Sequence, residues 1–322
     1  MHFVDSSITT VIYKPYRPKT IHPIIGVILT NTKGSLYMVA AMAAFAIEDM
    51  LIKSAAETTS LGQILALFGL GGMLIFMLLT WRKGEKIFHP AILSTPILIR
   101  ATCEVVGRFT FALAITLTPL SSASAILQAT PLIAMIGAAL LFGEQVGVKR
   151  WLAVLVGFIG VLMIIRPGLE GFEATSLLAV IATLGFAGRD LATRAAPPVL
   201  SNMQLGVYGF FVLIPAGVAI QIYQNEPAQL NTTASIQIIG AIIFGVAAYN
   251  ALTIAMRAGD VSVIAPFRYT RLLFALALGI FIFGESPDLM TLLGSLLVVL
   301  SGGYTLTQTR KMLTVTTIKD GT

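Results

Sequence analysis

A succession of long apolar segments, separated by short polar connections, constrains this fold more than any other feature of the sequence. About ten such segments occur, at roughly 34–54, 61–80, 91–117, 121–143, 150–167, 174–194, 202–223, 235–256, 262–283 and 288–307. An α-helix of about 20 apolar residues crosses the hydrocarbon core of a bilayer, whereas an open strand edge finds no hydrogen-bond partner in lipid. Only 11% of the 322 residues are charged, compared with about 25% in an ordinary soluble domain. The sequence therefore predicts an all-α polytopic membrane protein with ten transmembrane helices.

Lysine and arginine residues gather in alternate connections, which predicts the orientation of the chain, because cytoplasmic connections carry an excess of these residues. With both termini in the cytoplasm, the external side has little beyond Lys53 and Arg166, and the cytoplasmic side holds Arg82, Lys83, Lys86, Lys149, Arg150, Arg194, Arg257, Arg310, Lys311 and Lys319. Residues 1–33 contain one apolar run, PIIGVILT, which is too short to span and lacks a small-residue cleavage site. We expect residues 1–33 to be a cytoplasmic tail rather than a signal peptide, and residues 308–322 to be a second cytoplasmic tail.

The two halves of the sequence repeat one another at an offset of 141 residues. GSLYMVAAMAAFAIEDMLIK (34–53) aligns with TSLLAVIATLGFAGRDLATR (175–194), and the identical pairs include Phe45/Phe186 and Asp49/Asp190. The same offset superposes FGE at 142–144 on FGE at 283–285. Apolar helices share alanine and leucine by chance, so the acidic pair and the agreement of two distant matches carry the argument. We predict that residues 34–167 and 174–307 are two copies of one unit.

Each predicted repeat contains five spans. Because five is odd, the second copy enters the membrane upside down relative to the first. Inverted repeats around a site near the membrane midplane are typical of secondary transporters, since two related halves can rock to expose the site to each side in turn. The sequence therefore indicates alternating-access transport of a small-molecule solute.

Three charged residues, Arg100, Glu104 and Arg108, lie within the third apolar segment. Their spacing places them on one helical face, and each costs roughly 2.5–3.5 kcal/mol near the centre of a bilayer. Glu104 can pair with either arginine, and the remaining positive charge needs a water-filled cavity or an anionic or hydrogen-bonding solute. We predict that all three contact the solute. A structural ion pair that locks this span to a neighbour is the alternative.

Arg268 and Arg271 lie on one face of the ninth predicted span, which contains no acidic residue. Guanidinium groups without a local partner suit planar, bidentate recognition of a carboxylate, a phosphate or a carbonyl-rich ring. Tyr269 lies between them and aligns with Gln128 at the repeat offset, so both halves carry a hydrogen-bonding group there. We predict that these four residues bind solute. The alternative for the arginines is an ion pair across the bundle with Glu48 or Glu104.

Charged residues near the ends of the two aligned segments suggest gates. Glu48 and Asp49 in the first span align with Arg189 and Asp190 in the sixth. Inverted topology is expected to place the two pairs at opposite faces of the membrane, which makes them candidates for two gates. End-of-helix salt bridges are the alternative.

Other polar residues and prolines interrupt the apolar segments. Tyr249 and Asn250 in the eighth span can donate and accept hydrogen bonds; we include both as candidates for solute contact, although an intramembrane asparagine often bridges helices instead. Pro131 and Pro266 are expected to interrupt the fourth and ninth spans, because proline frees a backbone carbonyl.

Few residues suited to catalysis or metal binding lie in the apolar segments. The three histidines (His2, His22 and His89) fall in polar stretches, and Cys103 is the only cysteine. Because a disulfide or cysteine metal site needs more thiols, and because no serine-centred nucleophile motif is present, we predict no enzymatic activity, metal or cofactor. A purely structural scaffold would not need so many buried charges. The net charge of +6 reflects loops that face anionic membrane lipid and indicates no nucleic-acid partner.

Two stretches resemble the EamA-type repeats of the drug/metabolite transporter superfamily over residues 34–307: ASAILQATPLIAMIGAALLFGE with WLAVLVGFIGVLMIIRPG, and VSVIAPFRYTRLLFALALGIFIFGE. Within that superfamily, SAILQATPL, RPGLEGF, RDLATR and FRYTRLLFALALG resemble the bacterial riboflavin-uptake transporters. The resemblance implies a multi-pass protein of the bacterial inner membrane that takes up riboflavin.

A flavin offers carbonyl groups to an arginine fork, a ring face to Tyr249 or Tyr269, and a ribityl chain to Gln128 and Asn250. Export of amino acids or related metabolites and uptake of a nucleoside-like solute would use many of the same groups. Both stay open as alternatives.

Overall fold

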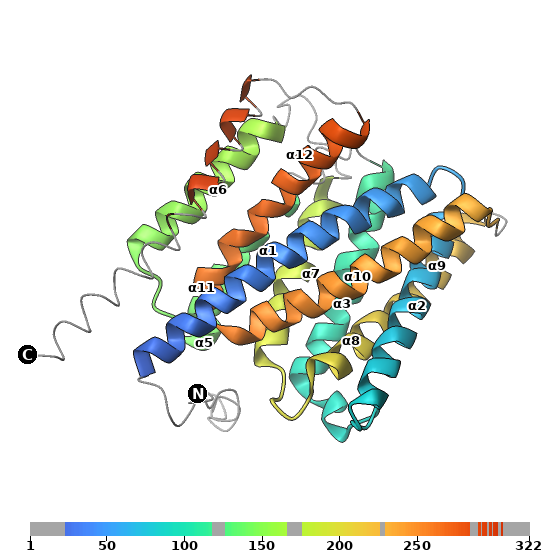
Figure 1. The fold of residues 1–322 in the computed structure, drawn as a ribbon, viewed down its shortest axis with the longest axis horizontal. Coiled ribbons are helices and arrows are strands. Elements are labelled where there is room, and N and C mark those ends of the chain that lie inside the picture. The colour runs from blue at the N-terminus through green and yellow to red at the C-terminus, as the bar shows by residue number, and fades with distance from the viewer. Residues whose placement is uncertain are drawn as a thin grey trace, which may run out of the picture.

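The computed structural model describes residues 23–117, 126–165, 176–225 and 229–283, together with short helical pieces between residues 289 and 304. Every regular element in these ranges is a helix (Figure 1). The predicted tail at 308–322, Arg166 and the second FGE motif at 283–285 lie wholly or partly outside the described residues. The all-helical prediction is confirmed for the described part of the chain.

The described part of the first half of the chain forms long helices and one short 3₁₀ turn. They are α1 (Pro23–Ala55), α2 (Leu61–Arg82), η1 (Pro90–Leu93), α3 (Thr95–Leu117), α5 (Thr130–Phe142) and α6 (Val148–Ile165). The side chain of Ser60 accepts from the backbone of Gln63 and caps the start of α2. Gly143 ends α5 with a φ of 64°, a left-handed conformation that glycine adopts without steric cost.

The second half contains more breaks than its apolar pattern predicts. It forms α7 (Ser176–Ala195), α8 (Asn202–Phe211), α9 (Leu213–Gln224), α10 (Thr232–Ala258), α11 (Val261–Ile264), η3 (Ala265–Tyr269) and α12 (Thr270–Phe283). The single predicted span at 202–223 is divided at Val212, near Pro215, which has no N–H to donate to the carbonyl of Phe211. The predicted interruption at Pro266 is confirmed, because η3 replaces the α-helix there.

The first helix is longer than predicted. α1 begins at Pro23, so the run PIIGVILT continues into the predicted first span without a break. Two glycines, Gly26 and Gly34, lie in this part of α1, and each glycine costs a helix only about 1 kcal/mol. The predicted tail at residues 1–33 therefore ends in the first turns of α1.

Four stretches within the described helices are long and apolar enough to cross a membrane: Thr30–Ile52, Leu61–Arg82, Asn202–Gln224 and Thr232–Ala258. Their length and composition indicate a multi-pass membrane protein. The count of ten spans and their inverted arrangement stay predictions.

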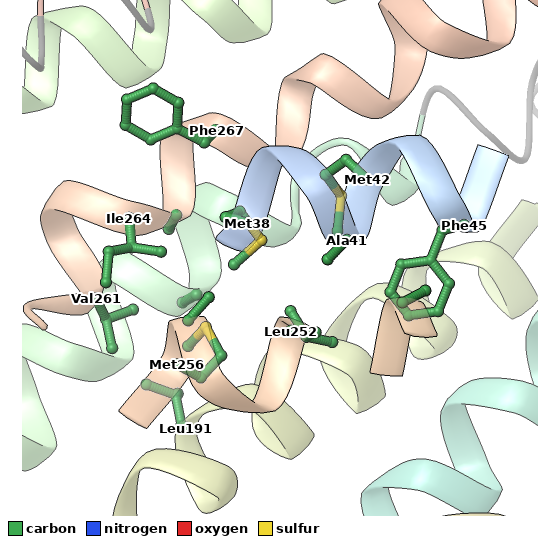
Figure 2. Close-up of a cluster of buried hydrophobic side chains, with 14 of the residues drawn as sticks. Met38, Ala41, Met42, Phe45, Leu191, Leu252, Met256, Val261, Ile264 and Phe267 are labelled. Carbon is green, nitrogen blue, oxygen red and sulfur yellow. The ribbon is translucent and has the colours of Figure 1, made fainter. Parts of the chain in front are cut away.

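The helices pack through small residues and one large apolar cluster. A Cβ added to Gly185 of α7 would lie 2.8 Å from the backbone of Gly107 in α3, so these two helices touch through their main chains. Figure 2 shows the cluster in which Met38, Met42 and Phe45 of α1 meet Leu252 and Met256 of α10 and the short helix α11. α1 and α10 run side by side across the molecule (Figure 1).

Candidate functional site

The charged face of α3 lies inside the bundle, against α1, α7 and α10. Glu104 is fully buried. Its Oε1 lies 3.4 Å from Nε of Arg108 and 3.5 Å from Nη1 of Arg189, and the hydroxyl of Tyr249 donates to its Oε2 at 3.1 Å. The predicted pairing of Glu104 with an arginine of its own helix is confirmed for Arg108. One carboxylate thus joins three helices.

Arg100 holds three further contacts and is 2% exposed. It donates to the hydroxyl of Thr193 at 2.9 Å, the carbonyl of Leu205 at 3.0 Å and the hydroxyl of Tyr249 at 2.7 Å. These acceptors come from α7, α8 and α10, and all of them are neutral. The hydroxyl of Tyr249 therefore links Arg100 to Glu104 by hydrogen bonds.

Arg108 extends the network to α1. Its Nη1 lies 3.4 Å from Oε1 of Glu48, and its guanidinium lies 5.9 Å from the ring centroids of Phe68 and of Phe186. Oε2 of Glu48 is buried and has no hydrogen-bond partner within the described part of the chain. Arg108 is therefore held by long contacts rather than by a tight fork.

The two arginines that follow Pro266 each meet one of the acids related by the repeat. Arg268 pairs with Oδ2 of Asp190, whose Oδ1 accepts from Arg189 at 2.8 and 3.0 Å. Nε of Arg271 donates to Oδ2 of Asp49 at 2.9 Å. The alternative of ion pairing across the bundle is thus present, but the partners are Asp190 and Asp49 rather than Glu48 and Glu104.

A cavity lies beside this network. The space between the lining atoms, counted together with the open solvent at its mouth, amounts to about 660 Å³. Four arginines, one acid and three aromatic rings contribute to its walls, which are formed by Phe45, Asp49, Ile52, Leu61, Leu65, Arg108, Phe111, Leu127, Phe186, Arg189, Arg268 and Arg271. The side chain of Asp49 is 45% exposed and that of Arg271 is 19% exposed. The cavity therefore opens at the end of the bundle where α1 ends and α2 begins.

The network carries more positive than negative charge. Five arginines (Arg100, Arg108, Arg189, Arg268 and Arg271) meet four carboxylates (Glu48, Asp49, Glu104 and Asp190), which leaves a surplus of one positive charge among these residues. A charge inside a membrane protein is commonly stabilised by water or by a solute in a cavity. The arrangement suits a solute that offers carbonyl oxygens or negative charge.

The structure does not separate the two predicted gates. Glu48 contacts Arg108, which contacts Glu104, which contacts Arg189. The expected placement at opposite faces is therefore wrong for Glu48 and Arg189, because α1 and α7 both approach the charged face of α3 near the centre of the bundle. The proposed gating role of these four residues stays a prediction.

Some predicted binding residues lie away from the cavity. The hydroxyl of Tyr269 donates to the carbonyl of Val154 in α6 at 3.3 Å, and its ring packs beside Met135. Gln128 is buried in the turn before α5, where its neighbour Leu127 forms the wall instead. Tyr249 belongs to the charge network, and Oδ1 of Asn250 is buried without a partner among the described residues. Solute contact by these residues stays a prediction.

The aromatic residues of the cavity wall were not among the predicted binding residues. Phe45 and Phe186 occupy equivalent positions of the repeat, so their identity at the 141-residue offset was the signal that could have found them. Phe111, Leu61 and Leu65 carry no comparable pattern.

The model of the EamA-like transporter family matches residues 32–166 and 174–306 of this chain. The chain belongs to this family. The two matched stretches coincide closely with the two predicted repeats. The EamA assignment also fits the charged cavity, which a lipid-facing or purely structural bundle would not need.

Relatives of this EamA protein carry several substrates in their names. A riboflavin transporter of Vibrio cholerae is 30% identical over 58% of this chain and 62% of its own length. An S-adenosylmethionine uptake transporter of Rickettsia prowazekii is 24% identical over 60% of this chain and 65% of its own length. A pseudopaline exporter, CntI, of Pseudomonas aeruginosa is 24% identical over 83% of this chain and 94% of its own length. The chain thus matches less than two thirds of the first two relatives.

A crystal structure of another protein has the same fold. It superposes with a TM-score of 0.74 at 15% sequence identity, over 87% of this chain and 99% of the other. At that identity the likeness concerns the fold alone.

Proposed function

We propose that this EamA transporter carries riboflavin, or a polar heteroaromatic solute of similar size, into the bacterial cytoplasm by alternating access. The observation that supports this most is the cavity in which Arg108, Arg189, Arg268 and Arg271 meet aromatic walls. A flavin offers carbonyl and imide groups to guanidinium donors and a flat face to rings. The named riboflavin transporter among the relatives supports the same choice.

The charge of the cavity separates riboflavin from one competing solute. S-adenosylmethionine carries a sulfonium cation, which is disfavoured by a wall that carries four arginines and one carboxylate. An uncharged flavin meets no such penalty. Uptake of S-adenosylmethionine or another nucleoside-like solute is therefore the weaker alternative.

Export is the second candidate for direction. The relative named as a pseudopaline exporter matches most of its own length, and the same cavity can serve either direction in an alternating-access cycle. Export of amino acids or related metabolites would use the same arginines for a carboxylate.

The proposed cycle rests on two inverted five-helix repeats with both termini in the cytoplasm of a bacterium. Reporter fusions at positions 86, 149 and 315 should then report a cytoplasmic location, and fusions at positions 57, 170 and 226 an external one. An external reporter at position 315 would contradict this topology.

The solute is tested by growth. Expression in a riboflavin-auxotrophic bacterium without its own importer should restore growth on low external riboflavin. Arg268→Ala and Arg271→Ala should raise the riboflavin concentration that growth requires, whereas Arg82→Ala, which changes an exposed arginine at the end of α2, should leave it unchanged. Failure to rescue growth, with the protein present in the membrane, would exclude riboflavin uptake.

A further inference from the structure

Two phenylalanines of the cavity wall occupy equivalent positions in the two repeats. Phe45 of α1 and Phe186 of α7 align at the 141-residue offset, and each lies one helical turn before an aligned acid, Asp49 or Asp190. Residues four apart lie on the same helical face. Each helix therefore carries a ring and a carboxylate on one face, and three of these four side chains, Phe45, Asp49 and Phe186, line the cavity.

Each ring and acid together contact one guanidinium group at close range. Arg271 lies 5.1 Å from the ring centroid of Phe45 while its Nε donates to Asp49 at 2.9 Å. Arg189 lies 5.0 Å from the ring centroid of Phe186 while it donates to Asp190 at 2.8 and 3.0 Å. The carboxylate accepts hydrogen bonds from the group, and the ring lies within the distance of about 6 Å that is typical of cation–π contacts.

Both supported guanidinium groups belong to the cavity wall. A guanidinium plane that is backed by a ring leaves its other face and its remaining N–H groups for a third partner. A flat, carbonyl-rich ring can stack on that face and accept from those N–H groups. A flexible or non-planar solute gains only the hydrogen bonds.

We infer that Phe45 and Phe186 determine specificity for flat rings, because they hold the guanidinium planes of Arg271 and Arg189 toward the cavity. The inference rests on the proposed uptake of a flavin-like solute and names the residues that select its ring rather than its sugar-alcohol chain. The two phenylalanines are positioning residues, since they act through the arginines.

The first measurement uses the unchanged protein. Competition for uptake of labelled riboflavin is measured with an N-methylated isoalloxazine, which is the flavin ring alone, and with ribitol, which represents the chain alone. The ring alone should compete and ribitol should not. If ribitol competes as well as the ring, the inference is wrong.

The second measurement uses variants. Phe45→Leu and Phe186→Leu should each raise KM for riboflavin about 5-fold, the size expected for loss of one guanidinium–ring contact, and should weaken competition by the isoalloxazine in the same proportion. Phe45→Tyr and Phe186→Tyr keep the ring and should restore the wild-type KM. Phe45→Met and Phe186→Met fill similar volume without a ring, so they replace any leucine variant that is missing from the membrane.

Phe111→Leu is the matched control. Phe111 also lines the cavity, and it meets Phe186 edge-on with ring centroids 6.1 Å apart. No guanidinium among the described residues lies over the ring of Phe111. The KM of Phe111→Leu for riboflavin should therefore change less than the KM of Phe45→Leu or Phe186→Leu. Equal effects at Phe45, Phe111 and Phe186 would overturn the inference while riboflavin uptake continued. A wild-type protein without riboflavin uptake would instead contradict the proposed function.

Discussion

The two ends of the helix bundle are held together by different kinds of contact. At the cavity end, where α1 ends and α2 begins, charged side chains pair with other charged side chains, and Arg108 lies 3.4 Å from both of its acidic partners. At the opposite end, where α10 gives way to α11, side chains bind backbone groups at helix termini. Glu144 accepts from the N–H groups of Val261 and Ser262, both at 3.0 Å.

Other contacts strengthen this second end, which we call the capped end. The N–H of Asp260 donates to Oδ1 of Asn31 at 2.7 Å, and Arg257 donates to the carbonyl of Leu200 at 2.8 Å. The apolar cluster in Figure 2 places Val261 and Ile264 against Met38 in the same region. The capped end is therefore closed by both hydrogen bonds and packing.

The two kinds of contact differ in what their release exposes. A side-chain ion pair can exchange one partner for a solute without disturbing any helix. A cap on a helix terminus cannot be released without exposing backbone N–H groups that then need water. In the proposed alternating-access cycle, the ion pairs at the cavity end would exchange partners, and release of the caps would open the capped end.

The largest effect is expected from a substitution that breaks the charge network behind the cavity. Glu104→Ala leaves Arg108, Arg189 and Tyr249 without their common acceptor, and removing one partner of a buried ion pair costs about 3–5 kcal/mol. We expect a large fall in Tm and in membrane abundance, measured on detergent-solubilised protein. Glu57→Ala, which removes an exposed glutamate beyond the end of α1, should change neither quantity. A Glu104→Ala protein as stable as the wild type would show that the network does not hold the bundle together.

The next effect separates transport from stability at the cavity end. Arg108 is 13% exposed and lines the cavity, so water can solvate the acids that Arg108→Ala leaves behind. We expect this variant to lose transport at normal membrane abundance, measured as uptake per molecule. Arg108→Lys keeps the charge but not the planar fork, and should recover transport only in part. Loss of folded protein without loss of uptake per molecule would mark Arg108 as a structural residue.

A smaller effect is expected from a substitution that loosens the capped end. Glu144→Ala removes two acceptors from the start of α11, a change comparable to losing a helix cap at about 1–2 kcal/mol, which corresponds to a factor of about 5–30 in population. We expect the buried position of Val263 to react faster with a thiol reagent, measured on Val263→Cys in a Cys103→Ala background. Glu144→Gln keeps one acceptor oxygen and should give an intermediate rate. An unchanged rate in both variants would show that Glu144 does not close this end.

The smallest expected effect on stability lies at the mouth of the cavity. Asp49 and Arg271 are partly exposed, and such pairs contribute about 0–1 kcal/mol. Arg271→Ala should therefore raise KM while leaving Tm nearly unchanged. Arg268→Ala, which leaves the buried Asp190 with one fewer partner, should raise KM and lower Tm together. Equal falls in Tm for the two variants would remove the distinction between mouth and interior.

The helices and one local ion pair could be predicted from the sequence. Apolar segment length predicted the helical spans, Pro266 predicted the interruption by η3, and the i, i+4 spacing predicted that Glu104 meets Arg108. These features depend on the bilayer, on proline chemistry and on the geometry of one helix, which are all readable from neighbouring residues. The added turns at the start of α1 and the break at Val212 depended on weaker local preferences, which the apolar pattern does not reveal.

Which charged residues meet across the bundle depends on the tertiary structure. Arg268 meets Asp190 and Arg271 meets Asp49 over separations of 78 and 222 residues, and no local spacing fixes such partners. These pairs join α1, α7, η3 and α12, and their partners depend on how those helices cross. Glu48 of α1 and Arg189 of α7 enter one network through Arg108 and Glu104 of α3, because a residue's position along its own helix does not state which helix it faces.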